Sequence, residues 1–497
     1  MNIALLTDAD VFAGTERHIL DLAVALGAQG QTVTIACPVP APLADKARAA
    51  GIRVVPVAKR RMPDFAAIKI LAAELRSGRV DIIHAHNGRT HLLSVAAVKL
   101  AGRGRVVATQ HFLAPNRTGR HGPKALLAGI LHRWAGKNTA AFIAISQAVK
   151  DQMLIRGDAP AEKITVVHNG TPEPEKTSPE LIAALRMELG VGNRPMIFCA
   201  ARLQKEKDIP TLIKAVAALR FNDHGSMSND QKLPEGTQNL EPGIWNTGNL
   251  RQAPPAGQNT ECIANTAITE CTEDSNSFPK LFIAGEGDQR GECERLIAAL
   301  RFNDQGAMTN DQKLMDDGGE FTTKTQRHEG PGEDPQISQI AGLAGQPAGR
   351  GPVASEQNGG AALPENSRFQ VPGSSFSSGI RLLGFRSDVS ALMAACDIFV
   401  LPAPAEPFGL VIIEAMALGK PVIAAGAGGP LEIVADGETG LLFSPGSSDS
   451  LAAGMKRLLT DADLRQRMGA AGRKRYEEMF TAQQMAEKML AAYAASR

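Results

Sequence analysis

The chain has 497 residues, of which 43% are apolar, and its 53 Lys and Arg residues nearly balance its 52 Asp and Glu residues. This length predicts two or three domains with cores large enough to need no disulfide bonds, and the sequence has no collagen repeat and no coiled-coil heptad. The charge is uneven, because residues 1–172 hold 22 basic and 11 acidic side chains whereas the rest of the chain is acidic overall.

The sequence predicts a cytoplasmic protein. No apolar run approaches the roughly 20 residues that a membrane-spanning helix needs. Residues 1–8 lack the basic region of a signal peptide and predict a first strand instead. The six cysteines are scattered without the paired spacing of a zinc site, which favours reduced thiols.

Short apolar runs alternate with longer segments whose apolar residues recur every three or four positions, such as 16–26 and 65–75. This alternation predicts β-α-β units and a parallel sheet. The strands predicted before residue 170 are 3–7, 33–36, 54–57, 82–85, 106–109, 141–145 and 164–167.

The pattern pauses at residues 171–179, which are rich in proline and charge, and we interpret them as a linker. We therefore expect an α/β protein with two Rossmann-like, doubly wound domains facing each other across a cleft, at 1–172 and 173–475. A C-terminal helix in 476–497 is expected to pack back on the first domain. The strands predicted for the second domain are 196–200, 281–284, 380–383, 398–401, 422–425 and 441–443.

Two low-complexity stretches, 221–277 and 302–378, interrupt the second domain. Each begins with nearly the same sequence, since residues 220–233 and 301–314 agree at 11 of 14 positions. Both follow a predicted helix, so we interpret them as inserts on the side of the sheet away from the ligand edge. Their polar composition favours disorder, and a small folded module is the alternative.

The most informative motif surrounds two glutamates, Glu406 and Glu414, which follow the predicted strand 398–401. A helix is expected to begin near Gly409, and a helix start attracts anions. Two carboxylates on either side of such a start suit a ligand with a diphosphate and flanking hydroxyl groups. A solvated helix face is the alternative for the glutamates alone.

Other charged and glycine residues also follow predicted strands. Arg202 and Lys207 lie at the carboxyl end of the strand 196–200, where an open parallel sheet binds ligands. Gly14 follows the first strand and allows a close backbone approach. His86 and His111 follow two further strands, although a lone histidine is more often structural.

These motifs together resemble the retaining GT-B glycosyltransferases of family GT4. The glutamate region is the most specific match, and the matches before residue 172 are looser. The resembling stretches are AGTER (13–17), TQH (109–111), AISQAVK (144–150), VVHNG (166–170), ARLQKEKD (201–208), LFIAGEGDQR (281–290), IRLLGFRSDVSALMAACDIFVLP (380–402), EPFGLVIIEAMALGKPVIA (406–424) and GGPLEIVADGETGLLF (428–443).

The resemblance implies transfer of a sugar from a nucleotide-sugar donor, with retention at the anomeric carbon and without a metal or other cofactor. Arg202 and Lys207 would bind the diphosphate and Glu414 the ribose. Glu406 would hold the donor sugar, and His111 would meet that sugar from the first domain. The backbone around the helix start would complete the donor site, at Phe408, Gly409, Leu410 and Val411.

The sequence departs from the family pattern at two positions. Ala13 stands where the family usually has the first glycine of a Gly-Gly pair with Gly14, which puts that donor contact in question. Asp208 stands where a glycine commonly follows Lys207.

The basic first domain points to an anionic acceptor or membrane surface. Residues 122–138 predict a helix with Leu126, Ile130 and Trp134 beside basic side chains, which is typical of a helix lying in an anionic membrane interface. An ordinary helix with these three residues in the core is the alternative. We expect a glycan or lipid-linked acceptor, in lipopolysaccharide or cell-envelope glycan synthesis, and peripheral association with the inner face of the cytoplasmic membrane. No nucleic-acid-binding motif is present.

Two other functions remain compatible with the pattern. One is a nucleotide-sugar enzyme of the same fold with different chemistry, such as an epimerase. The other is a non-catalytic scaffold, which Ala13 and the inserts suggest. The presence of Arg202, Lys207, Glu406 and Glu414 argues against a scaffold, because binding alone does not need all four.

Overall fold

The computed structural model describes residues 1–57, 64–113, 123–221, 279–300 and 379–496. The predicted inserts lie outside the described residues, except that Phe221 ends helix α8, Ile209–Phe221.

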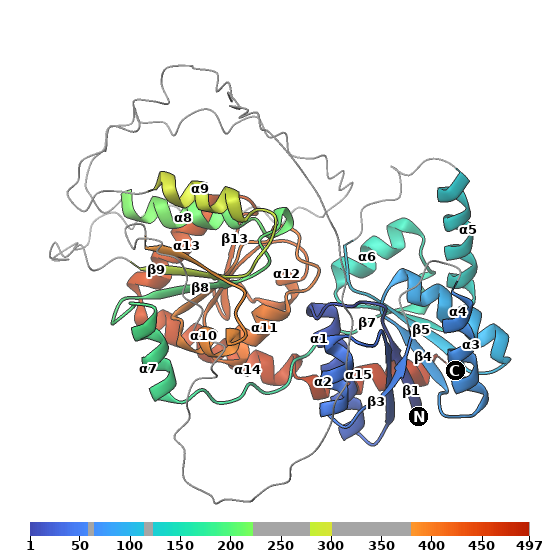
Figure 1. The fold of residues 1–497 in the computed structure, drawn as a ribbon. Helices are drawn as coiled ribbons and strands as arrows, with labels where there is room; N and C mark the ends of the chain where they lie inside the picture. The colour runs from blue at the N-terminus through green and yellow to red at the C-terminus, as the bar shows by residue number, and fades with distance from the viewer. Residues whose placement is uncertain (58–63, 114–122, 222–278, 301–378, 497) are drawn as a thin grey trace, which may run out of the picture. The chain divides into compact units, whose positions relative to one another are not determined.

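The first sheet has seven parallel strands in the spatial order β3-β2-β1-β4-β5-β6-β7. Helices cover both of its faces (Figure 1). Its strands are therefore nearly continuous apolar runs rather than alternating ones, and all four residues of β4 are buried. The strands are β1 (Asn2–Leu6), β2 (Thr32–Cys37), β3 (Arg53–Pro56), β4 (Ile82–Ala85), β5 (Arg105–Gln110), β6 (Ala141–Ala144) and β7 (Ile164–Val166).

The helices of the first sheet have local start signals. The Asn87 side chain accepts hydrogen bonds from the backbone N–H groups of Arg89 and Thr90 and so caps α4, while Ser146 caps α6 in the same way. The helices are α1 (Gly14–Ala28), α2 (Pro42–Ala49), α3 (Phe65–Arg76), α4 (Gly88–Ala101), α5 (Pro123–Lys137) and α6 (Gln147–Arg156).

The second sheet has six parallel strands in the order β10-β9-β8-β11-β12-β13, and the described helices again cover both faces (Figure 1). The strands are β8 (Met196–Ala200), β9 (Lys280–Ala284), β10 (Ile380–Gly384), β11 (Ile398–Leu401), β12 (Val422–Ala425) and β13 (Gly440–Phe443). The other described helices from residue 179 onward are α7 (Pro179–Glu188), α9 (Arg290–Ala299), α10 (Val389–Ala395), α11 (Leu410–Ala417), α12 (Pro430–Ile433), α13 (Ser448–Thr460), α14 (Ala462–Met479) and α15 (Ala482–Ala495).

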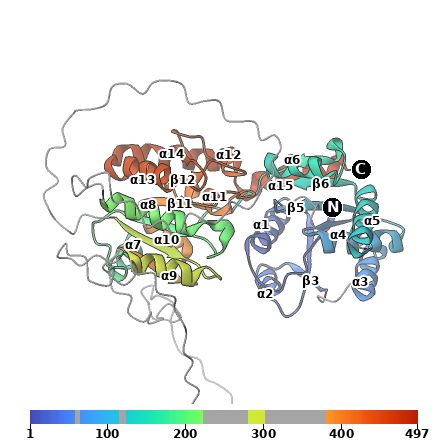
Figure 2. The same ribbon diagram turned by 90° about the horizontal axis from the view of Figure 1, so that it is seen from above.

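The last helix, α15, belongs to the core of the first sheet. It packs against α1 (Figure 2), and its buried side chains share a hydrophobic cluster with Ile3, Leu5 and Leu22. Helix α14 continues to Met479, beyond the domain boundary expected at residue 475. The buried side chains of α15 are Ala482, Met485, Ala486, Met489, Ala492 and Tyr493.

The chain thus passes between the two sheets twice, and the two passages are hydrogen-bonded to each other. The Thr171 N–H donates to the Phe480 carbonyl at 3.0 Å, and the Ala482 N–H donates to the Thr171 carbonyl at 2.9 Å. A side chain at Gly170 would lie 2.2 Å from the Thr481 carbonyl oxygen, so only glycine allows this approach.

The predicted fold class, an α/β protein with two Rossmann-like parallel sheets, is confirmed. Each of the thirteen predicted strands coincides with an observed strand to within one residue at either end. Among the described residues, no helix is both long enough and apolar enough to cross a membrane.

Because α15 completes the core of the first sheet, shortening one of its buried side chains should destabilise the protein. Met489 is fully buried, so Met489→Ala should lower the free energy of unfolding by about 2–5 kcal/mol through lost burial and a residual cavity. Lys488→Ala, on the exposed side of the same helix, should change it by less than about 0.5 kcal/mol. If chemical denaturation showed the same loss of unfolding free energy for both variants, the placement of α15 would be contradicted.

Candidate active site at the carboxyl ends of the strands

The strand order of the second sheet reverses between β8 and β11. In an open parallel sheet, ligands bind beyond the carboxyl ends of the strands at such a reversal point. The loop after β8 carries Arg202 and Lys207, and the loop after β11 carries Glu406. The fold therefore brings the residues of two separate motifs to one place.

Lys207 and Glu406 form an ion pair, with 2.5 Å between the Nζ and an Oε atom. Their side chains are only 18% and 13% exposed, so each charge is partly removed from water and is compensated by the other. Arg202 differs, because its side chain is 61% exposed and pairs with Glu206 at 3.6 Å. A surface pair of this kind is weak and leaves the guanidinium able to reorient.

The turn that carries Lys207 is a 3-10 turn, Lys205–Lys207, which ends at Asp208. Asp208 has φ 49°, a left-handed conformation that favours glycine and that aspartate tolerates better than most residues. Asp208 thus supports the turn in the place of a glycine.

Helix α11 begins directly after Gly409, whose φ of 108° places it in the left-handed region. The backbone at Gly409 and Leu410 therefore forms the helix start that the sequence predicts. The side chain of Phe408 is buried, with ring centres 5.8 Å from His168 and 6.1 Å from Phe480. Phe408 consequently anchors the loop, and only its backbone is available to a ligand.

Glu414 lies in the second turn of α11 and is half-buried. Burial raises its pKa from the ordinary value of 4.5 to about 7. The charge of Arg17 on α1 opposes this shift, and that of Asp21 adds to it. Arg17 and Asp21 form an ion pair with each other at 2.9 Å. The positive charge of Arg17 therefore does not fully compensate a negative charge on Glu414.

Gly14 begins α1, and a Cβ atom placed there would lie 3.7 Å from Leu410 Cδ1. The structure therefore brings Gly14 close to the start of α11. The preceding Ala13 has φ −130°, a conformation open to any residue, so alanine is not strained there.

Glycines in two neighbouring loops support the site, and the sequence analysis gave them no separate role. A Cβ at Gly429 would lie 2.3 Å from the Phe408 Cα, and one at Gly428 2.4 Å from the Glu406 carbonyl oxygen. A Cβ at Gly285 would lie 1.9 Å from the Ala201 carbonyl oxygen. The loops that carry Glu406 and Arg202 thus pack directly against these glycines, and the contact leaves no room for a side chain at the glycine positions. Glycines within a few residues of the end of a strand are the sequence signal for such packing.

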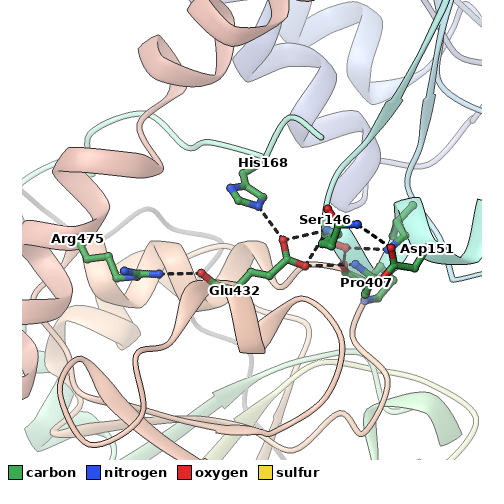
Figure 3. Close-up of polar contacts among 9 residues, drawn as sticks. Ser146, Asp151, His168, Pro407, Glu432 and Arg475 are labelled. Atoms are coloured by element: carbon green, nitrogen blue, oxygen red, sulfur yellow. Dashed lines mark hydrogen bonds and ion pairs between the residues drawn. The ribbon is translucent and has the colours of Figure 1, made fainter. Parts of the chain in front are cut away.

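A second set of contacts ties the Glu406 loop to the start of α6 (Figure 3). Ser146 Oγ donates a hydrogen bond to the Pro407 carbonyl at 2.7 Å, and the Gln147 N–H donates to the Glu432 carboxylate at 2.8 Å. His168 Nε2 lies 2.8 Å from the same carboxylate. Although burial raises the pKa of Glu432, the hydrogen bonds from His168 and the backbone bring it below its usual value.

At the first sheet, His86 and His111 meet beyond the ends of β4 and β5. His86 Nδ1 lies 3.0 Å from His111 Nε2, and both side chains are buried. Burial, reinforced by the neighbouring histidines, lowers both pKa values well below 6.5, so both rings are neutral. His18 on α1 joins them, with its ring centre 4.9 Å from that of His111, and the sequence analysis did not single it out.

The raised pKa of Glu414 should make stability depend on pH. The folded state retains a proton that the unfolded chain releases above about pH 4.5, so this carboxyl group lowers stability as the pH rises from about 4.5 to about 7. Glu414→Gln should remove this dependence, and its melting temperature relative to wild type should rise across that range and then level off. The exposed Glu438→Gln is the matched control, and a parallel response in both variants would contradict the assignment.

Two family matches cover most of the described chain. Residues 12–173 match Glycosyltransferase Family 4, and residues 375–475 match Glycosyl transferases group 1. Together these matches span 263 of the 497 residues.

Curated relatives match over shorter stretches. A sulfoquinovosyl transferase of Arabidopsis thaliana is 39% identical over 94 residues, which is 18% of this chain and 18% of the relative. A D-inositol 3-phosphate glycosyltransferase of Stackebrandtia nassauensis is 40% identical over 106 residues, 21% of this chain and 24% of the relative. A lipopolysaccharide core biosynthesis glycosyltransferase of Rhizobium meliloti is 34% identical over 93 residues, 19% of this chain and 27% of the relative. The chain thus matches less than a third of the length of each.

Solved structures share the whole fold at low identity. HepE of Anabaena, in a complex with UDP and glucose, has a TM-score of 0.63 and 20% identity, with 99% of each chain covered. A glycosyltransferase of Rickettsia africae has a TM-score of 0.65 and 18% identity, with 99% of this chain and 98% of that chain covered. The fold of both sheets is therefore GT-B, and with its two family matches the chain belongs to the GT4-type glycosyltransferases.

Proposed function

We propose that this protein is a retaining glycosyltransferase that moves a sugar from a nucleotide-sugar donor to a glycan or lipid-linked acceptor of the cell envelope. The observation that carries the proposal is the ion pair of Lys207 with Glu406 at the reversal point of the second sheet, beside the start of α11. A cation, a carboxylate and a helix start match the diphosphate and hydroxyl groups of such a donor.

In this proposal the Lys207 side chain moves from Glu406 to the donor diphosphate. The exposed Arg202 side chain reorients and binds the same diphosphate. The start of α11 contributes backbone N–H groups at Gly409, Leu410 and Val411. Glu406, once released, accepts hydrogen bonds from the donor sugar, and Glu414 holds the ribose. The related fold of HepE has been solved with UDP and with UDP-glucose, which supports UDP-sugars as the first donors to test.

The reaction breaks the bond between the anomeric carbon and the diphosphate oxygen. The acceptor oxygen bonds to that carbon on the same face, and its proton passes to the departing phosphate oxygen. Negative charge grows on the diphosphate as the bond breaks, so Lys207 and Arg202 bind the transition state more tightly than the ground state. These cations supply the stabilisation of the leaving group without a metal cofactor. His111 would contact the donor sugar from the first domain.

The acceptor side of the proposal rests on the first domain. It carries the excess of basic residues, and α5 exposes Ile130 (49%), Leu131 (41%) and Trp134 (39%) next to the exposed Arg133. Ile130 and Trp134 therefore do not lie in the core, as an ordinary buried helix would require. This surface suits an anionic membrane that carries a lipid-linked acceptor. Relatives named for lipopolysaccharide core and capsular polysaccharide synthesis support an acceptor of the cell envelope.

Kinetics of single variants test the donor site. Lys207→Ala should reduce kcat about 100-fold, because the lost charge acts mainly in the transition state, and Arg202→Ala should resemble it. Glu414→Ala should mainly raise the KM of the donor, since ribose contacts are similar in both states. Glu406→Ala should impair both parameters.

The assay measures acceptor-dependent release of the nucleoside diphosphate at saturating donor, with UDP-, GDP- and ADP-sugars tested in turn. Lys205→Ala, an exposed lysine in the same turn, should retain turnover. Near wild-type turnover in both Lys207→Ala and Arg202→Ala would refute the roles of these residues. Interconversion of nucleotide-sugars without acceptor would indicate an epimerase instead.

Binding to lipid vesicles tests the membrane surface. The protein should bind phosphatidylglycerol vesicles more tightly than phosphatidylcholine vesicles, and salt should weaken the binding. Trp134→Ala should reduce binding severalfold, whereas Phe385→Ala, which removes a residue that is 83% exposed after β10, should not. Equal binding to both lipids would remove the membrane from the proposal.

A further inference from the structure

Three histidines form a buried triangle beyond the carboxyl ends of the first sheet. His18, His86 and His111 are 2%, 1% and 7% exposed. They come from α1, from the residue after β4 and from the residue after β5. One nitrogen from each ring can be chosen so that all three lie within 4.8 Å of one another.

The three rings are spaced as the ligands of one metal ion are. Their centres lie 4.9 Å (His18–His111), 5.3 Å (His86–His111) and 5.6 Å (His18–His86) apart. Tetrahedral zinc with Zn–N bonds of about 2 Å places the centres of its imidazole ligands about 5 Å apart. His86 Nδ1 and His111 Nε2 lie 3.0 Å apart and are hydrogen-bonded to each other.

The cluster contains nitrogens that have no hydrogen-bond partner. Both ring nitrogens of His18 and the Nε2 atom of His86 are buried without one. His84, whose ring centre lies 4.3 Å from that of His86, differs, because its two nitrogens are hydrogen-bonded to Tyr493 and Thr109 at 2.6 Å. Burying a polar atom without a partner is unfavourable, so His18, with both of its ring nitrogens unpartnered, indicates a missing ligand.

We propose that His18, His86 and His111 bind one Zn²⁺ ion, with water in the fourth position. Three imidazoles with an open position are a known zinc ligand set. His84, fixed by Tyr493 and Thr109, packs against His86 and supports its orientation. This inference rests in part on the proposed function: in the proposed transferase, a Zn²⁺ ion bound to His111 keeps that side chain from contacting the donor sugar. The ion therefore inhibits transfer rather than assisting it.

Titration of the full-length protein with Co²⁺ tests the site without an activity assay, because tetrahedral Co²⁺ absorbs strongly in the visible range. We expect one equivalent to bind and Zn²⁺ to displace it. His18→Gln and His86→Gln should each weaken binding at least about tenfold. His91→Gln is the matched control and should bind normally, since His91 is buried but bonded to Thr139 outside the cluster. Absent binding, or binding that His18→Gln leaves unchanged, would overturn the proposal.

A second measurement is made on the wild-type protein and needs no variant of the three cluster histidines. In wild-type protein labelled with ¹⁵N-histidine, Zn²⁺ should change the ring-nitrogen resonances of three of the ten histidines at one equivalent. Changes confined to other histidines, assigned through the His91→Gln and His168→Gln spectra, would place the metal elsewhere and overturn the site.

Discussion

The Lys207 ammonium and the Glu406 carboxylate lie 2.5 Å apart at the point where the strand order of the second sheet reverses. Each is mostly shielded from water, so neither can lose its partner without a replacement. A ligand that binds Lys207 in place of Glu406 must therefore also donate a hydrogen bond to the Glu406 carboxylate. A nucleotide-sugar has both an anionic diphosphate and sugar hydroxyl groups, whereas a nucleoside diphosphate alone lacks the sugar. The pair thus fits the donor of the proposed reaction better than its nucleoside diphosphate product.

The backbone around this pair is held by close packing against glycines and by the buried side chain of Phe408. Gly428 and Gly429 lie against the backbone of Glu406 and Phe408, and Gly285 lies against Ala201. Phe408 is buried between His168 and Phe480, which fixes the residue before Gly409, the N-cap of α11. The packing that holds these loops does not involve the charged ends of Lys207 and Glu406.

The strands and the edge of the sheet that carries the site could be predicted from the sequence, because both depend on local patterns. Apolar runs marked the strands, and the residues after them had to lie at one edge. The pairing of Lys207 with Glu406 could not be predicted, since it joins residues 199 positions apart. His18 was missed for a similar reason, because its position in α1 gives no sign that His86 and His111 lie nearby. The exposure of Trp134 depends on how α5 packs, which an amphipathic pattern does not determine.

The contribution of α15 to the first core has a consequence for synthesis of the protein. Met485, Met489 and Tyr493 are synthesised only after both sheets, yet they fill the same cluster as Ile3 and Leu5. The first domain therefore cannot complete its core until α15 has been synthesised, although N-terminal domains usually fold first. Its apolar surface stays open until then, and a chain truncated before residue 482 never closes it.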